Sequence, residues 1–176
     1  SGVDIWVNVA GADVLTGAAG DWDFAQKLDT LWAVDVRATI LLSREVGRRM
    51  FEQHSQQSPA VIIHTGWDQA ETGMAGDPGE LFGPIKAAIM AFSKSQAQTL
   101  APRVRVNCVA PGWIRTAWSG EASEYWQHRA AKESLRDRWG TPEDVAKVVG
   151  FIASDDADFL DGQVIPVNGG FRYGLS

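Results

Sequence analysis

Short strand-like runs alternate with longer stretches of helical periodicity along this chain, and this alternation restricts the fold more than any other feature. Residues 3–10 are apolar at nearly every position, as in a strand of a parallel sheet covered by helices on both sides. Residues 60–64 and 104–110 predict two further strands. Residues 163–167 predict a fourth, which belongs at a sheet edge because Pro166 cannot donate to a central ladder.

Helical spacing fills the intervals between these runs. Residues 31–51 predict one long helix, and residues 66–79 predict a loop rich in glycine and acidic residues. Residues 85–92 predict another helix, with Pro84 in its first turn, where no backbone donor is lost. Thr141, followed by proline and two acids, predicts the N-cap of a third helix. The order of elements is that of a parallel α/β sheet with right-handed crossovers.

Composition limits the class of protein. A chain of 176 residues, 45% hydrophobic and 22% charged, is typical of one globular domain. The formal net charge of -6 opposes binding along a phosphate backbone, so we expect no nucleic-acid partner. We expect no membrane span, because no apolar run approaches the roughly 18 residues that a bilayer requires. We expect no signal peptide, because the N-terminus lacks a basic segment followed by a long apolar one. We also expect no metal site. The single cysteine, Cys108, predicts a buried, inert thiol in a cytoplasmic protein.

The ends of the predicted strands locate the candidate site. In parallel sheets of this kind, ligands bind beyond the carboxyl ends of the strands, so the loops after residues 10, 64 and 110 are expected to meet. The second of these loops contains Trp67 and Asp68.

Phe82 and Lys86 are four residues apart on a predicted helix, so their side chains share one face. A tyrosine at position 82 would be a usable acid, because the lysine charge would stabilise its phenolate. A phenylalanine cannot exchange a proton. The sequence therefore raises the question of whether this face still supports chemistry.

Five segments together resemble the short-chain dehydrogenase/reductase family. They are DIWVNVAG at residues 4–11, Lys86 on its helix, NCVAPG at residues 107–112, TPEDVA at residues 141–146 and GQVIPVNGG at residues 162–170. The resemblance implies a Rossmann-type, doubly wound parallel sheet in three α/β/α layers, of which this chain matches the C-terminal two-thirds. It also implies NAD or NADP as cofactor, oxidation of alcohols or reduction of carbonyls, and a homo-oligomer (a dimer or tetramer) formed through the helices of residues 31–51 and 81–100.

The family uses a serine, a tyrosine, a lysine and an asparagine. Carried over by position, the lysine is Lys86, the tyrosine position is Phe82 and the asparagine position is Asp35, which is expected to face Lys86. The serine position is Trp67, or one of its two neighbours if the alignment shifts by one residue. The resemblance places cofactor contacts at Asn8, Ala10, Gly11, Lys86, Pro111, Ile114 and Thr116, with an N-cap as the other interpretation of Thr116.

The family's Gly-rich turn, where a helix N-terminus holds the cofactor pyrophosphate, is not in this sequence. The chain begins on what resembles the family's fourth strand, which leaves residues 3–10 as an open sheet edge. We therefore expect residues 1–176 to be a single Rossmann-type domain that is incomplete at its N-terminus, either as part of a longer protein or with an edge supplied by a partner.

Residues 113–140 correspond to the family's substrate lid and predict a helix of their own. This segment contains Trp118, Tyr125, Trp126 and His128. Either these side chains form a packing stripe, or they form an aromatic lid over an apolar small-molecule ligand.

Two main functions remain open at this point. One is an NAD(P)-dependent oxidoreductase with an altered constellation, in which Lys86 orients the ribose and a water, Asp68 or His64 handles the proton. The other is a non-catalytic relative that binds a ligand or serves as an interaction subunit. Because loss of a positioned acid or base costs roughly 10²- to 10⁴-fold in rate, the sequence favours impaired catalysis.

Overall fold

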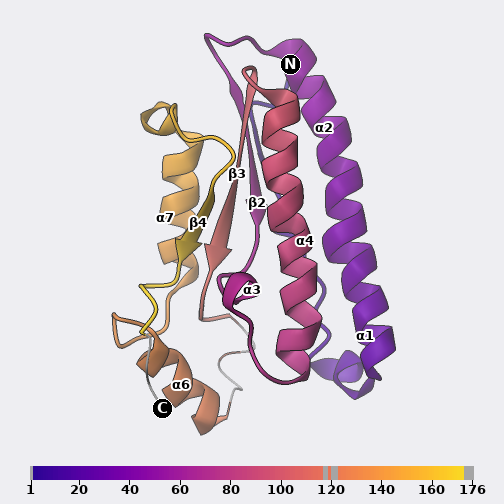
Figure 1. Ribbon diagram of the computed structural model, residues 1–176, viewed down its shortest axis with the longest axis vertical. Helices are drawn as coiled ribbons and strands as arrows, with labels where there is room; N and C mark the ends of the chain where they lie inside the picture. Colours follow the sequence, from indigo (N-terminus) through magenta and orange to yellow (C-terminus); the bar gives the residue numbers. More distant parts are fainter. Residues whose placement is uncertain (1, 117–118, 120–122, 173–176) are drawn as a thin grey trace.

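The computed structural model describes residues 2–116, 119 and 123–172. Its strands form one parallel four-stranded sheet in the order β1-β2-β3-β4 (Figure 1). The strands are β1 (Ile5–Val7), β2 (Ala60–Thr65), β3 (Val104–Pro111) and β4 (Val164–Val167). The predicted parallel α/β sheet is confirmed, and β4 with its proline lies at an edge as expected.

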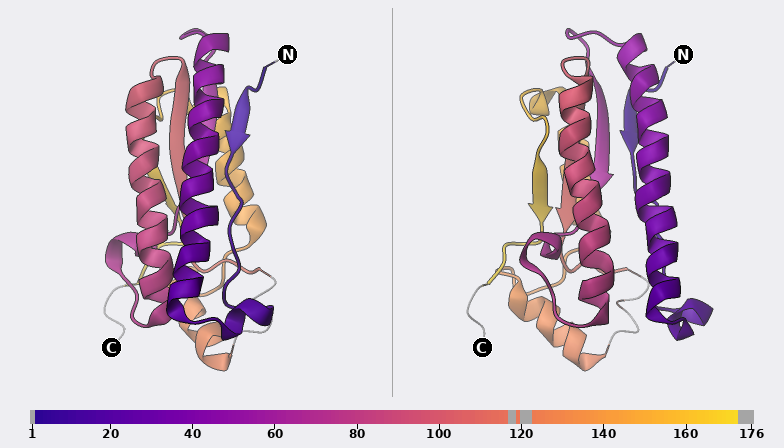
Figure 2. Two further views of the ribbon diagram at one scale, coloured as in Figure 1. Left: turned by 90° about the vertical axis from the view of Figure 1, so that its right-hand side faces the viewer. Right: turned by 45° about the vertical axis from the view of Figure 1, so that its right-hand side comes forward.

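Helices cover both faces of the sheet, which gives the expected three layers (Figure 2). On one face lie α1 (Phe24–Leu31), the π-helix η2 (Trp32–Ala38), α2 (Thr39–Gln53) and α4 (Asp77–Leu100). On the other lies α7 (Pro142–Ala153). The shorter elements are η1 (Gly17–Asp21), α3 (Gln69–Thr72), α6 (Glu124–Glu133) and η3 (Asp155–Ala157).

The core divides between the two faces because successive side chains of a strand point to opposite sides. Ile62 packs with Met50 of α2 on one face, whereas Ile63 packs with Ile152 of α7 on the other. Both isoleucines are fully buried. A strand buried on both faces is uniformly apolar, which is the pattern of the sequence here.

The helix predicted at residues 31–51 is longer and is not uniform. It begins at Phe24, where the Asp23 carboxylate accepts from the amide of Gln26 in a capping box. Its middle section, η2, is π-helical. Such wide turns are rare and occur frequently at functional sites, and this one contains Asp35.

The prediction for the start of α4 was wrong. The helix begins at Asp77, so that Pro78 occupies the first turn and Pro84 lies inside the helix. Gly76 permits the turn with a φ of 90°, and the acid at position 77 is favourable at a helix N-terminus. The predicted loop before this helix also contains α3.

Strand β1 is shorter than the predicted residues 3–10. The strand ends at Val7. The carbonyl of the next residue, Asn8, accepts a hydrogen bond from the side-chain hydroxyl of Thr65. Among the described strands β1 lies at the end of the sheet, and Ile5 is 50% exposed because α7 lies over β2 and β3.

Candidate active site

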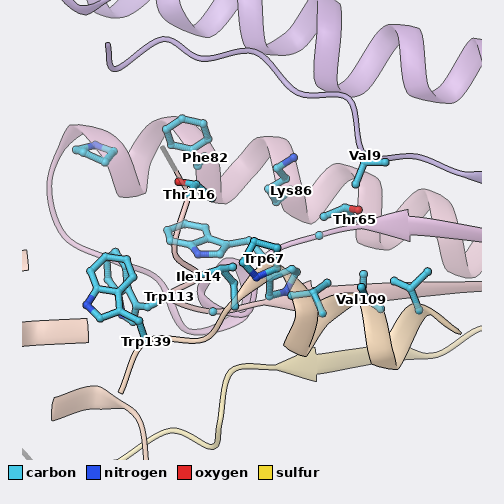
Figure 3. Close-up of a pocket in the computed structure, with 18 of the residues that line it drawn as sticks. Val9, Thr65, Trp67, Phe82, Lys86, Val109, Trp113, Ile114, Thr116 and Trp139 are labelled. Carbon is cyan, nitrogen blue, oxygen red and sulfur yellow. The ribbon is translucent and has the colours of Figure 1, made fainter. Parts of the chain in front are cut away.

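A pocket of about 840 Å³ lies at the carboxyl ends of β1, β2 and β3 (Figure 3). Val9 lines it after β1, Trp67 after β2, and Ile114 after β3. The predicted meeting of the three loops is therefore confirmed. Its volume falls within the range of about 300–1,000 Å³ that is usual for small-molecule sites.

Many of the residues carried over from the family resemblance line this pocket: Trp67, Phe82, Lys86, Pro111, Ile114 and Thr116. Four others do not. Asp35 lies behind Lys86 and is not part of the lining. Asn8 donates instead to the hydroxyl of Ser43, Ala10 is exposed, and Gly11 lies against the Asp35 carboxylate.

Lys86 and Asp35 form an ion pair, with Lys86 Nζ 2.8 Å from Asp35 Oδ1. The second carboxylate oxygen accepts from the Ala12 amide at 2.9 Å. Asp35 is only 3% exposed, so its charge is balanced inside the protein by the lysine. The expected pairing of these residues is confirmed, and it binds the one cationic side chain among the described lining residues to a buried anion.

Phe82 and Trp67 provide apolar wall at the two positions where the resemblance expects tyrosine and serine. The Trp67 indole N–H is a donor that does not give up its proton. Apart from indole groups, the polar side chains of the lining are Thr65, Lys86 and Thr116. No carboxylate is among the described lining residues.

His64 points away from this pocket and is fully buried. Its Nδ1 lies 3.2 Å from the amide nitrogen of Asn8, and its Nε2 lies 2.9 Å from Gln96 Oε1. An amide donor on one side and an amide acceptor on the other fit the neutral ring with hydrogen on Nε2. Burial lowers the pKa of His64 more than the bond to Gln96 raises it, so the ring is a neutral structural link.

Asp68 is half-buried, which differs from the solvated side chain that its loop position predicts. Its Oδ2 accepts from Asn168 Nδ2 at 3.0 Å, while its buried Oδ1 has no hydrogen-bond partner. Burial raises the pKa of this carboxyl, and the bond from Asn168 opposes the rise. Asp68 is not part of the pocket lining.

The lid segment contains the predicted helix, α6, together with a cluster of tryptophans. The ring centroid of Trp113 lies 5.5 Å from that of Trp126 and 5.9 Å from that of Trp139, and all three line the pocket. Trp126 is thus both a packing residue and part of the lid. Tyr125 is 63% exposed and His128 is exposed, while Trp118 lies outside the described residues.

A polar clamp holds this cluster in place. Glu133 accepts from Trp113 Nε1 at 2.7 Å and from Arg129 Nε at 2.6 Å. The Arg129 guanidinium also lies 5.2 Å from the centroid of Trp126. Sequence reasoning assigned no role to Trp113 or Trp139. Trp113 directly follows the Pro-Gly pair at the end of the third strand, and this position was the available signal that Trp113 belongs to the site.

The parallel sheet, its two helical layers and a pocket at the strand ends define an α/β protein of the Rossmann type. Within that class, the chain belongs to the short-chain dehydrogenase/reductase family. Residues 1–172 match the family model described as enoyl-(acyl carrier protein) reductase. The oxidoreductase family inferred from the sequence motifs is confirmed, and members of this family generally use NAD(P).

Named relatives show the same relationship. The chain is 32% identical over 173 residues to tropinone reductase-like 3 of Erythroxylum coca, covering 96% of this chain and 62% of that protein. It is 34% identical over 175 residues to 3-oxoacyl-[acyl-carrier-protein] reductase FabG of Aquifex aeolicus, covering 96% and 65%. A short-chain dehydrogenase/reductase from Brucella melitensis, described as glucose/ribitol dehydrogenase, superimposes with a TM-score of 0.80 at 25% identity, covering 98% and 66%. This chain therefore spans less than two-thirds of the length of these relatives.

Among the described residues, no helix has the length and apolar character needed to cross a membrane. Within the same residues, no group of three or more histidine, cysteine, aspartate or glutamate side chains is placed to hold a metal ion.

Proposed function

We propose that this protein is a short-chain dehydrogenase/reductase whose oxidoreductase activity is strongly impaired and whose pocket binds a small molecule. One observation carries the proposal: Phe82 and Trp67 line the pocket at the positions where the family resemblance expects proton-exchanging hydroxyls. Neither side chain can serve as an acid or a base. The pocket is retained while its means of moving a proton is not.

No described neighbour takes over this role. A general acid must lie within hydrogen-bond reach of the substrate oxygen or act through one water. His64 is held neutral between two amides, and the Lys86 ammonium is bound to Asp35. The Thr65 hydroxyl donates to a backbone carbonyl at 2.8 Å, and an aliphatic hydroxyl, unlike the phenol of tyrosine, is too weak an acid for the task.

A nicotinamide cofactor suits part of this site. When bound, NAD or NADP gives or takes a hydride. Lys86, Ile114 and Thr116 lie on the pocket wall where they would hold the nicotinamide nucleotide, as the resemblance implies. The described residues contain no Gly-rich turn to hold the pyrophosphate, so Asn8, Ala10 and Gly11 remain proposed contacts through their backbone groups only.

A homo-oligomer belongs to the same proposal. The resemblance implies a dimer or tetramer with contacts through the helices that correspond to α2 and α4. Leu41 and Leu42 of α2 are 53% and 55% exposed, and contact with a second copy would remove them from water.

A second candidate function is a slow oxidoreductase that uses Asp68 as its acid. The supporting observation is that burial raises the pKa of Asp68 and leaves its Oδ1 without a partner. A protonated carboxyl next to Trp67 in the chain would reach the pocket only after a change of side-chain conformation. Asp68→Asn would remove any residual turnover that depends on this group.

The test is turnover by the purified protein, followed by the loss of NADH or NADPH absorbance with tropinone and an acetoacetyl thioester as substrates. These carbonyl compounds follow from the names of the relatives. The expected rate is about 10²-fold or more below that of an active family member assayed alongside. Efficient turnover at the rate of that enzyme would overturn the proposal, and turnover abolished by Asp68→Asn would favour the second candidate.

A further inference from the structure

The pocket is almost free of net charge. Lys86 is the single charged side chain among the described lining residues, and Asp35 neutralises it from behind at 2.8 Å. A carboxylate or phosphate ligand would have to compete with Asp35 for the ammonium. An ammonium ligand would meet no carboxylate in the wall. Charged ligands therefore lose their hydration without gaining a new ionic partner.

The end of the pocket near the lid is built from aromatic rings. Trp67 follows β2, Phe82 lies on α4, and Trp113, Trp126 and Trp139 come from the segment after β3. In the view of Figure 3 the Trp67 indole lies in the middle of the group, with Phe82 and Thr116 on one side and Trp113 and Trp139 on the other. Aromatic rings attract one another in stacked or edge-to-face arrangements beyond the effect of their buried area.

The lid rings are fixed before a ligand arrives. Trp113 Nε1 donates to Glu133 at 2.7 Å, and Trp139 Nε1 donates to the Gln127 carbonyl at 3.3 Å. Their orientation is therefore set by the lid, and a ligand meets ring surface more than ring N–H. Preformed surfaces of this kind cost little conformational entropy on binding.

We infer that this end of the pocket takes an uncharged, flat aromatic molecule that stacks against Trp67. The inference rests on the proposed function, because Trp67 and Phe82 supply ring surface at the positions proposed to have lost their hydroxyls. The remaining N–H groups of Lys86 and the Thr116 hydroxyl can bind one oxygen of such a molecule. The absence of a carboxylate from the described lining and the paired state of Lys86 set the preference for an uncharged ligand.

Three probes of similar size separate the contribution of the aromatic plane from that of ligand charge. 2-Naphthol is flat, aromatic and uncharged; decahydro-2-naphthol keeps the hydroxyl without the aromatic plane; and 2-naphthoate adds a negative charge. Titration calorimetry at neutral pH is expected to show 2-naphthol binding about 3- to 10-fold more tightly than decahydro-2-naphthol, and at least about tenfold more tightly than 2-naphthoate. Equal binding of the two alcohols, tighter binding of 2-naphthoate, or no binding of any probe would overturn the inference.

Substitutions test whether the Trp67 ring causes the preference for 2-naphthol. Trp67→Leu is expected to remove the preference for 2-naphthol over its saturated form while binding of decahydro-2-naphthol remains. Trp32→Leu is the matched control, because Trp32 is 52% exposed on η2 and does not line the pocket. If Trp67→Leu unfolds, Phe82→Leu tests the same preference from the opposite wall. Loss of the preference in Trp32→Leu, or its survival in both pocket variants, would contradict the assignment.

Failure of this inference is separate from failure of the proposed function. A protein that binds decahydro-2-naphthol as well as 2-naphthol but turns over no carbonyl substrate keeps the proposed function and loses the ligand class. A protein that turns over carbonyl substrates efficiently loses the proposed function whatever the probes show.

Discussion

Lys86 Nζ lies 2.8 Å from Oδ1 of Asp35, a carboxylate that is 3% exposed and lies in a π-helical turn of the neighbouring helix. The pair joins two helices on one face of the sheet at the wall of the pocket. The opposite charge of each partner compensates for the hydration that the other loses on burial. The lysine therefore has a structural role whether or not it also holds a cofactor.

Asp35→Asn is expected to lower the free energy of unfolding by about 1–3 kcal/mol, because Lys86 loses its charged partner while the bond from the Ala12 amide has an acceptor left. Urea denaturation measures the change. Asp29→Asn, at an exposed position on α1, is the matched control and should change stability by no more than about 0.5 kcal/mol. Equal losses in the two variants would show that the ion pair contributes nothing of its own.

His64 makes stability depend on pH. Burial lowers its pKa in the folded state, so below the unfolded-state pKa of about 6.5 the unfolded chain binds a proton that the folded protein resists. The free energy of unfolding should therefore fall as the pH falls through this value, by at most about 1.4 kcal/mol per pH unit.

The slope of unfolding free energy against pH measures this contribution. It should be shallower in His64→Gln than in the wild type between about pH 7 and pH 5. His128→Gln, at an exposed position, is the matched control. Identical slopes in all three proteins would mean that His64 takes up its proton as easily when folded as when unfolded.

Two glycines give opposite predictions for the same substitution. A Cβ on Gly66 would lie 2.7 Å from Met90 Cγ and 3.1 Å from Cys108 Sγ, so Gly66→Ala should cost about 1–3 kcal/mol of stability. A Cβ on Gly83, inside α4, would meet nothing within 4 Å, so Gly83→Ala should add about 0.4–1 kcal/mol. Thermal and urea unfolding of the two variants would report the signs directly, and destabilisation by Gly83→Ala would contradict the open space at that position of α4.

Local signals in the sequence were strong enough to place most of the sheet. The run of Val61, Ile62 and Ile63 is short, β-branched and apolar on both faces, which is the pattern of a strand buried between helical layers. Thr141 is likewise the N-cap that the sequence predicts, and in the structure it forms a capping box with Asp144. In these segments local preference and tertiary packing agree.

The errors arose where two local signals compete or where contacts are distant. Pro78 and Pro84 both fit a helix start, and only the turn at Gly76 selects the first of them. No spacing in the sequence groups Trp113 with Trp126 and Trp139, because their contact depends on the tertiary arrangement of the segment after β3. Side chains that meet only in the tertiary structure have no spacing rule in the chain.

The central claim is that this pocket has lost its proton donors while keeping its shape. The most direct measurement is the NAD(P)H-dependent turnover of the doubly substituted variant Phe82→Tyr with Trp67→Ser, compared with the wild type and with Phe82→Tyr alone. The phenol that replaces Phe82 lies one helical turn from Lys86, whose charge would favour its ionised form. We predict a gain of at least about 10²-fold for the double variant over the wild type. Wild-type turnover that already equals that of the double variant, with Phe82 and Trp67 in place, would contradict the account.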